Sequence, residues 1–236
     1  MARITREKFD TFGNVFDQFT YRNLFKLSSQ GHFRELQSPI SIGKEANLFT
    51  ALTENGGKVI VKIYRLQTCD FNRMYDYLRA DPRFMGVKHN RRQVVFAWAK
   101  REYRNLLKAR QIGIRVPTPQ ALLHNIVVME HIGRDAPAPK VKDAVPADPE
   151  KFCATTTRFV RKFYRAGMVH GDLSMFNILN DDGEPVFIDF SQSAPIDDPQ
   201  ADALLARDCK NLAVLYGKLG VKMTAAQLQA VVEKKK

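Results

Sequence analysis

The chain has 236 residues, of which 44% are hydrophobic and 26% charged, and its formal net charge is +12. This length can bury a sizeable core as one domain or as two closely packed lobes. No apolar run reaches the roughly 18 residues of a membrane span, and the first ten residues lack the apolar core of a secretory signal. We therefore expect no membrane association and a cytoplasmic location.

The positive excess favours polyanionic partners, with nucleic acid as the first candidate. A basic but solvated surface would explain the total equally well, so the clusters carry more information. They are Arg91 and Arg92; Lys100, Arg101, Arg104, Lys108 and Arg110; and Arg158, Arg161, Lys162 and Arg165. The three cysteines, Cys69, Cys153 and Cys209, show no CxxC spacing, so buried free thiols are expected rather than a zinc site or a disulfide framework.

Residues 1–38 are predicted to form a helical extension that covers the first lobe. Its apolar stripe consists of Phe12, Val15, Phe16, Phe19, Leu24 and Leu27. Residues 40–52 then predict two strands joined by a tight turn at Gly43, and residues 58–64 predict a third strand after a turn at 55–57. Ser41 and Lys44 near the first turn could reach nucleotide phosphates, although neither standard glycine fingerprint is present and an ordinary hairpin fits as well.

Lys62 alternates with Val61 and Ile63 in the third strand, so its side chain faces away from theirs. A lysine buried in that position needs an anionic partner, and Glu102 on a helix predicted over residues 93–110 is the candidate. Such a pair would direct the lysine ammonium group toward nucleotide phosphates. The alternative is that both side chains are exposed.

Residues 65–90 form an unusually long connection between the third strand and this helix, and Asp81 and Pro82 mark a break within it. Long connections in a compact domain are often functional, so this segment is a candidate contact for RNA or for a regulatory partner. Two strands follow over residues 121–129, and residues 130–133 end them as a connector whose backbone could bond an adenine edge. Residues 134–148, rich in proline and alanine, predict a loop. One helix is expected to open at Asp148 and Pro149 and to run to about residue 166. Another is expected to open at Asp198 and Pro199 and to run to about 219, and a last one is capped by Thr224.

The stretch HGDLSMFNIL at residues 170–179, a turn, and VFIDF at residues 186–190 bring together the side chains that phosphoryl transfer requires. Asp172 is the candidate base, which would orient the attacking oxygen, and Asn177 and Asp189 are candidate magnesium ligands. Each residue alone could be an ordinary turn residue. Asp208 is predicted to be buried and to bond backbone N–H groups of the 170–172 loop, or else to be a surface residue paired with a neighbouring cation.

These segments resemble the Rio-type atypical serine/threonine kinases, specifically the first Rio subfamily. The resemblance covers about residues 12–220. It is carried by SIGKEANLF (41–49), VKIY (61–64), RFMGVKHN (83–90), WAKREYRNL (98–106), VVMEHIG (127–133), HGDLSMFNIL (170–179), IDFSQS (188–193) and ARDCKNL (206–212).

The resemblance implies an α+β, bilobal protein-kinase-like fold: an N-terminal extension (1–38), an ATP-binding lobe with an antiparallel sheet and a helix (39–130), and a mainly helical catalytic lobe (131–236). It implies ATP with Mg²⁺ or Mn²⁺ as cofactors and the pre-ribosomal small subunit and its rRNA as partners. The implied nucleotide contacts are Ser41, Lys44, Lys62 paired with Glu102, and the backbones of Glu130 and Ile132. Asp172 would be catalytic, Asn177 and Asp189 would bind the metal, and Asp189 could itself accept a phosphoryl group, so that the cycle is an ATPase.

Two departures from ordinary protein kinases concern substrates. Gly171 stands where many kinases have an arginine, and the short stretch from Asp189 to Pro199 leaves no APE segment and little room for a peptide platform. Autophosphorylation or ATP hydrolysis on a bound ribosomal precursor therefore fits better than phosphorylation of free peptides. The alternatives are a small-molecule kinase of the aminoglycoside or choline kinase type and a non-enzymatic nucleotide-binding RNA scaffold.

Overall fold

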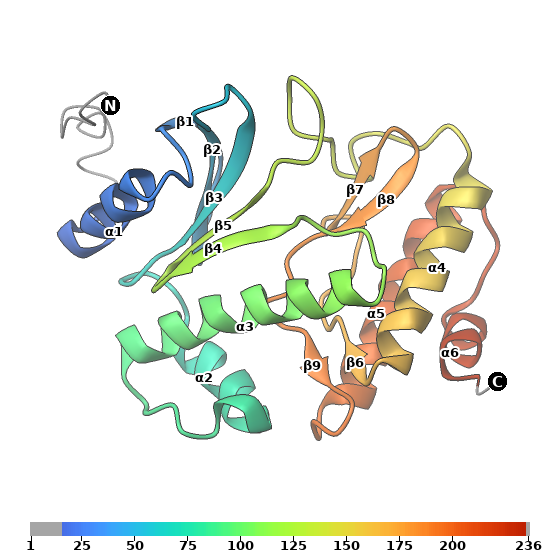
Figure 1. Cartoon of the computed structure of the whole chain (residues 1–236). Helices are drawn as coiled ribbons and strands as arrows, with labels where there is room; N and C mark the ends of the chain where they lie inside the picture. The colour runs from blue at the N-terminus through green and yellow to red at the C-terminus, as the bar shows by residue number, and fades with distance from the viewer. Residues whose placement is uncertain (1–15, 235–236) are drawn as a thin grey trace. The chain divides into compact units, whose positions relative to one another are not determined.

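The computed structural model describes residues 16–234, which divide into two compact units (Figure 1). Within the described chain, the first unit comprises residues 16–79, 84–103 and 118–131, and the second comprises 80–83, 104–117 and 132–234. Over these residues, no helix is both long and apolar enough to cross a membrane. Each unit has its own sheet and helix arrangement, and the fold class is the predicted α+β, protein-kinase-like one.

The first unit contains an antiparallel sheet of five strands in the order β1-β2-β3-β5-β4. The strands are β1 (Glu35–Ile42), β2 (Ala46–Leu52), β3 (Lys58–Tyr64), β4 (Pro119–Leu123) and β5 (Ile126–Glu130). The three predicted strands of the first half are confirmed, and β3 has the predicted bounds. Gly43 lies in the tight turn between β1 and β2, where its N–H donates to the carbonyl of Ala46.

Helix α1 (Gln18–Ser29) packs against this sheet and begins where Asp17 accepts a hydrogen bond from the N–H of Thr20. Leu24 and Leu27 are fully buried in one cluster with side chains of β2, β3 and β5. The prediction of a helical region through residue 38 is therefore wrong at its end, because residues 35–38 already belong to β1. Phe12 and Val15 lie outside the described residues.

The long connection predicted over residues 65–90 contains a helix, α2 (Phe71–Ala80), and a 3₁₀ turn, η2 (Pro82–Phe84). The helix was missed because only Met74 and Leu78 of its residues are buried, too few for a clear periodic signal. Helix α3 (Arg91–Gln111) follows, two residues longer at the start and one longer at the end than predicted. Its residues are divided between the two units.

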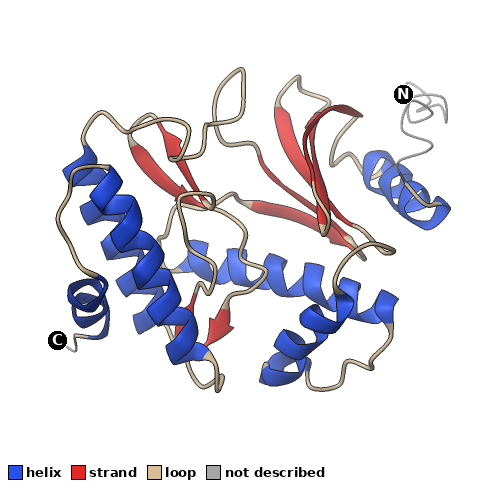
Figure 2. Ribbon diagram, turned by 180° about the vertical axis from the view of Figure 1, so that it is seen from behind, coloured by secondary structure: helices blue, strands red, loops and turns tan. Residues whose placement is uncertain are grey.

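The second unit is mainly helical, as Figure 2 shows by colour. It contains α4 (Pro149–Arg165), α5 (Ala201–Lys218) and α6 (Ala225–Glu233), and two short sheets that pair β6 (Met168–Val169) with β9 (Ala194–Pro195) and β7 (Ile178–Asp181) with β8 (Glu184–Phe187). The caps predicted at Asp148 and Thr224 are present, since Asp148 accepts from the N–H of Lys151 and Thr224 forms a capping box with Gln227. The helix start predicted at Asp198 and Pro199 is wrong, because α5 begins at Ala201 and its N-cap residue, Gln200, makes no side-chain cap hydrogen bond. The three cysteines are free and buried, as predicted.

Gly133 provides a test of the tight loop that enters the second unit. Its φ is +113°, and a Cβ there would lie 2.4 Å from the carbonyl oxygen of Ala136. Gly133→Ala should therefore lower the free energy of unfolding by about 2–3 kcal/mol, from backbone strain plus the clash. The matched control is Gly183→Ala, where φ is +89° and no atom lies within 4 Å, so only the strain of about 1 kcal/mol applies. Equal losses in urea unfolding of the two variants would contradict the described loop.

Candidate active site

A buried ion pair lies on the sheet of the first unit. Nζ of Lys62 is 2.6 Å from Oε1 of Glu102, and the two side chains are 8% and 1% exposed. The hydroxyl of Tyr64, two residues along β3 on the same face, donates to the other carboxylate oxygen of Glu102. The predicted pairing is thus present, and both carboxylate oxygens have a donor, which is what a buried charge requires.

The turn between β1 and β2 is fixed by the segment that follows β3. The N–H of Arg65 donates to the carbonyl of Glu45, its guanidinium donates to the carbonyl of Gly43, and Thr68 Oγ1 donates to the carbonyl of Lys44. Ser41 and Lys44 are exposed, as a role in phosphate contact requires. Hydrogen bonds from Arg65 and Thr68 thus fix the backbone carbonyls of this turn, which we call the braced turn. It differs in this respect from glycine-rich loops, whose backbone can approach phosphates without such bonds.

The connector after β5 has part of its backbone already bonded. The N–H of Glu130 donates to the carbonyl of Thr118, and the carbonyl of Ile132 accepts from the N–H of Ala138. The Glu130 carboxylate accepts from both the N–H and the hydroxyl of Thr118. The N–H of Glu130 is therefore already bonded within the sheet, and the carbonyl of Ile132 is bonded within the loop that follows.

In the second unit the three predicted oxygen-bearing residues belong to one hydrogen-bonded patch. Nδ2 of Asn177 donates to Oδ2 of Asp172 at 3.0 Å and to the Asp172 carbonyl at 2.8 Å. The carbonyl of Asn177 accepts from the N–H of Ile188, the residue before Asp189. Asp189 has a φ of +62°, a left-handed conformation that costs a non-glycine residue about 1 kcal/mol or more, and its Oδ1 accepts from Ser191.

The tautomer of His170 follows from its two hydrogen bonds. Nδ1 accepts from the N–H of Asp172, so Nε2 carries the proton and donates to the carbonyl of Ile188. Burial lowers the pKa of His170 to about 4, against a smaller opposing effect of the Asp189 carboxylate. The neutral ring therefore links the backbone at Asp172 to the backbone next to Asp189, and neither nitrogen is available as a metal ligand.

Helix α5 holds the loop that carries Asp172. The two carboxylate oxygens of Asp208 accept from the N–H groups of Gly171 and Leu173, each at 2.7 Å. Asn211, which lies one helical turn after Asp208, donates to the carbonyl of Leu173. Arg207, the residue before Asp208, donates to the carbonyl of Gly171. The prediction of a buried Asp208 is confirmed, because the residue is 1% exposed, and the surface alternative is wrong. Burial raises the pKa of Asp208 to about 7, against the lowering effect of the two N–H donors.

A second set of positioning residues was missed at the sequence level. Arg83 forms an ion pair with the fully buried Asp81 and donates to Oδ1 of Asn105. Nδ2 of Asn105 in turn donates to the carbonyls of Phe190 and Ser193, each at 2.9 Å. This network fixes the segment directly after Asp189. No sequence signal indicated it, because the three side chains are far from that segment along the chain.

The residues at this site fit magnesium better than zinc. Nδ2 of Asn177 is bonded to Asp172, so its amide oxygen is the atom that can act as a ligand, and Asp189 adds carboxylate oxygen. Both are hard oxygen donors, the type that Mg²⁺ prefers when phosphate oxygens and waters complete its shell. Among residues 16–234 no group of three His, Cys, Asp or Glu side chains could hold a metal by itself.

Some of the basic residues predicted as nucleic-acid contacts have structural roles. Arg101 is fully buried, and its guanidinium lies 5.5 Å from the ring centroid of Trp98, so it cannot form part of a surface cluster. Arg161 and Arg165 both donate to the carbonyl of Lys234, the C-cap residue of α6. Arg91 and Arg92 are exposed at the start of α3.

The sheet with its buried lysine–glutamate pair and the helical unit with its Asp–Asn–Asp set define the protein-kinase class of fold. Comparison with solved structures agrees: the Rio2 kinase–ADP/Mg²⁺–phosphoaspartate complex from Chaetomium thermophilum superimposes with a TM-score of 0.68 at 22% identity, over 92% of this chain and 67% of that one. At this identity the likeness shows the fold alone.

Sequence comparison gives the family. Residues 47–229 match the RIO domain. The chain is 40% identical to the RIO-type serine/threonine-protein kinase Rio1 of Haloferax volcanii over 91% of its length and 74% of that protein, and 43% identical to that of Methanocaldococcus jannaschii over 89% and 72%. The chain belongs to the RIO-type atypical serine/threonine kinases, first subfamily, and is a kinase.

The role of Asp208 predicts the effect of its removal. Asp208→Ala would leave the N–H groups of Gly171 and Leu173 buried without an acceptor, so the free energy of unfolding should fall by about 2–4 kcal/mol. The control is Lys210→Ala, an exposed position on the same helix, which should change it by no more than about 0.5 kcal/mol. Both free energies can be measured by denaturant unfolding. An unchanged midpoint for Asp208→Ala would exclude the positioning role.

The buried neutral His170 predicts a pH effect. Its folded pKa of about 4 lies below the ordinary value of 6.5, so protons bind preferentially to the unfolded chain and the stability contributed by His170 is lost as the pH falls from 6.5 toward 4. The free energy of unfolding of the wild type minus that of His170→Asn should therefore decrease by about 3 kcal/mol between pH 7 and pH 4. Taking this difference removes the opposite contribution of Asp208. A difference that does not vary with pH would show that His170 is not buried in its neutral form.

Proposed function

We propose that this kinase transfers the γ-phosphoryl group of ATP in the presence of magnesium, with Asp172 as catalytic base and Asn177 and Asp189 as metal ligands. The observation that carries the proposal is the hydrogen bond from Asn177 to Asp172, together with the bond that joins Asn177 to the backbone next to Asp189. Magnesium would neutralise charge on the phosphate oxygens. The amide hydrogen bond orients the Asp172 carboxylate, so its other oxygen can accept the proton of an attacking hydroxyl or water.

The candidate nucleotide contacts of the first unit support the same proposal. Glu102 and Tyr64 hold Lys62 in a defined direction, which suits a lysine that contacts phosphates as a point charge. The exposed Ser41 and Lys44 on the braced turn are proposed to contact the phosphates as well. The backbones of Glu130 and Ile132 would then bond the adenine edge.

The phosphoryl acceptor is proposed to be Asp189 itself. A carboxylate oxygen of Asp189 attacks the γ-phosphorus of ATP, the bond from this phosphorus to the β-phosphate oxygen breaks, and ADP leaves. Water then attacks the acyl phosphate, Asp172 takes the proton, and phosphate is released, which makes the cycle an ATPase. The Rio2 complex from Chaetomium thermophilum holds a phosphoaspartate together with ADP and Mg²⁺, which supports this acceptor. Phosphorylation of a serine or threonine of the same chain would use Asp172 as the base for the hydroxyl proton and the same metal ligands.

The biological setting that we propose is maturation of the small ribosomal subunit, with rRNA as the polyanionic partner. The net charge of +12 supports a nucleic-acid partner. The segment after Asp189 passes through β9 directly into α5, and its backbone is bonded by Asn105. This short, fixed segment leaves little room for a peptide-docking platform. It therefore supports ATP turnover on a bound ribosomal precursor over phosphorylation of a free peptide.

The proposed base gives the test of the reaction. Asp172→Asn keeps the shape of the side chain and removes the proton acceptor, so turnover of ATP should fall by a factor of about 10² or more. Affinity for ATP with magnesium, measured by calorimetry, should change by less than about threefold because the other proposed ligands remain.

The control for this experiment is Asp182→Asn. Asp182 is an exposed residue of the β7–β8 turn, and its positive φ of 50° is one that asparagine also tolerates. It should retain wild-type turnover. If Asp172→Asn turned over ATP at the wild-type rate, the assignment of the base would be wrong.

A further inference from the structure

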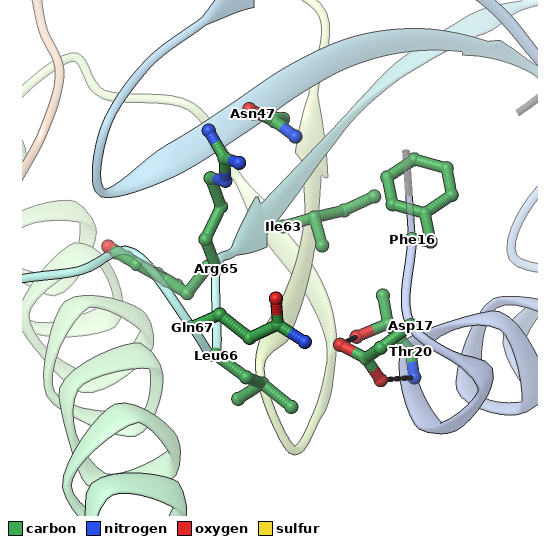
Figure 3. A pocket seen from close by; sticks show the side chains of 9 residues that line it. Phe16, Asp17, Thr20, Asn47, Ile63, Arg65, Leu66 and Gln67 are labelled. Atoms are coloured by element: carbon green, nitrogen blue, oxygen red, sulfur yellow. Dashed lines mark hydrogen bonds between the residues drawn. The ribbon is translucent and has the colours of Figure 1, made fainter. Parts of the chain in front are cut away.

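Two adjoining pockets lie in the first unit, beside the start of α1, and Figure 3 shows the residues that line the first of them. The first has a volume of about 240 Å³ and is lined by residues of α1, β2, β3 and the segment after β3. The second has a volume of about 630 Å³ and lies between the starts of α1 and α3. They share Asp17, Leu66 and Gln67, so together they form one continuous depression, which we call the α1 groove.

The α1 groove lies on the face of the sheet opposite the proposed nucleotide contacts. Strands β2 and β3 pair Asn47 with Ile63 and Leu48 with Lys62, and successive side chains of a strand point to opposite faces. Ile63 belongs to the core cluster under α1, so Asn47 and Ile63 face α1 while Lys62 faces Glu102. A ligand in the α1 groove would therefore not compete with ATP for Lys62.

The groove is electropositive. Arg65 lines the first pocket, and Arg22, Arg91 and Arg92 line the second, whereas among the described residues Asp17 is the one acidic residue that lines either. The Asp17 carboxylate already accepts from the N–H and the hydroxyl of Thr20. Helices α1 and α3 both begin here, and the N–H groups at a helix start add to the attraction for anions.

A buried side chain in the first pocket points to a ligand with a polar edge. Asn47 is 2% exposed, and its amide oxygen has no hydrogen-bond partner. A buried amide oxygen without a donor is unfavourable, and a donor group of a ligand would remove this cost. Phe16 and Ile63 line the same pocket, and the guanidinium of Arg92 lies over the Phe19 ring at 4.7 Å in the second. The groove thus combines an amide, apolar and aromatic surface, and four cations.

We propose that the α1 groove binds single-stranded RNA. The first pocket takes an unpaired base against Phe16 and Ile63, and the Asn47 amide bonds the polar edge of that base. The arginines of the second pocket contact the neighbouring phosphates. Single-stranded RNA is favoured over a duplex because its bases can leave the strand and enter a pocket. An acidic peptide could use the arginines and bond the amide through its backbone, but its acidic side chains offer no planar ring to place against Phe16 and Ile63.

This inference rests on the RNA partner of the proposed function and assigns it a surface. The other basic clusters fit that role less well, because Arg101 is buried and Arg161 and Arg165 bond the end of α6. It does not depend on the phosphoryl-transfer residues. Arg65 is left unchanged in the test below, because its guanidinium also braces the turn at Gly43.

The experiment measures fluorescence anisotropy of a labelled single-stranded RNA about 12 nucleotides long, roughly the site size of such grooves, with the full chain over a range of salt concentrations. Arg22→Ala/Arg92→Ala should weaken binding about tenfold, and the slope of log affinity against log salt should become shallower by about 1–1.5, since two phosphate contacts are lost. The matched control, Lys26→Ala/Arg34→Ala, removes the same charge from exposed positions of the same unit and should change affinity less than about twofold.

Asn47→Leu tests the base contact separately. It replaces an amide whose buried oxygen has no partner by an apolar side chain of similar size, so the protein should remain folded, as thermal unfolding would verify. RNA affinity should fall about threefold to tenfold with an unchanged salt slope, because no phosphate contact is lost. ATP turnover without RNA should be unchanged in all three variants, none of which alters a proposed catalytic residue.

The outcomes separate the two proposals. If the wild type bound no RNA, the RNA partner of the proposed function would fail, and the groove assignment with it. If the wild type bound RNA but the groove variants bound it equally well, or lost no more than the control, the groove assignment alone would be wrong. Equal affinity for an RNA duplex of the same length would also overturn it, as would displacement of the RNA by an acidic peptide at equal charge concentration.

Discussion

The second unit depends on the two hydrogen bonds that the carboxylate of Asp208 accepts from the 170–173 loop. The loop from His170 to Leu173 is too short to pair its own backbone groups, and buried N–H groups without acceptors are costly. Asp208 accepts two of these N–H groups, while its neighbours Arg207 and Asn211 donate to the carbonyls of the same residues. One face of α5 thus satisfies both backbone groups of Gly171 and of Leu173. Asp172 lies between them, so its position is determined by packing that does not involve its own side chain.

The same loop explains why glycine precedes Asp172. Gly171 has a φ of +79°, and a Cβ at this position would lie 3.0 Å from the carbonyl oxygen of Gln192. An arginine, which other kinases use here to bind a phosphorylated activation segment, would be strained in this backbone. The segment after Asp189 is instead held by neutral and charged side chains of the fold: Asn105 bonds two of its carbonyls, and Arg207 bonds the Gln192 side chain. Order in this region is therefore built into the structure and needs no phosphate.

Strand alternation separates the two proposed binding sites of the first unit. Lys62 and Tyr64 share the face that meets Glu102, whereas Ile63 points to the α1 side. A buried lysine–glutamate pair contributes little net stability, since desolvation offsets much of the Coulomb attraction. The pair instead fixes the direction of the Lys62 side chain. Lys62 and Tyr64 each donate to a different oxygen of the Glu102 carboxylate, so the carboxylate is held in one orientation. The opposite face is then available for the α1 groove, whose cations come from α1, α3 and the segment that follows β3.

The sequence by itself determined the family, the strands from Gly43 to Tyr64, the capped helices, and the residue types of the Asp172, Asn177 and Asp189 set. These features depend on local periodicity, turn chemistry and short motifs. It also indicated Asp208 and Glu102, because a charged residue among apolar neighbours in a helix requires a partner. Only the tertiary structure decided which partner each has, since hydrogen bonds such as that from Asn105 to Phe190 join residues far apart in the chain. It likewise decided that Arg101 is buried while Arg92 is exposed, because the face that a helical side chain occupies depends on what packs against it.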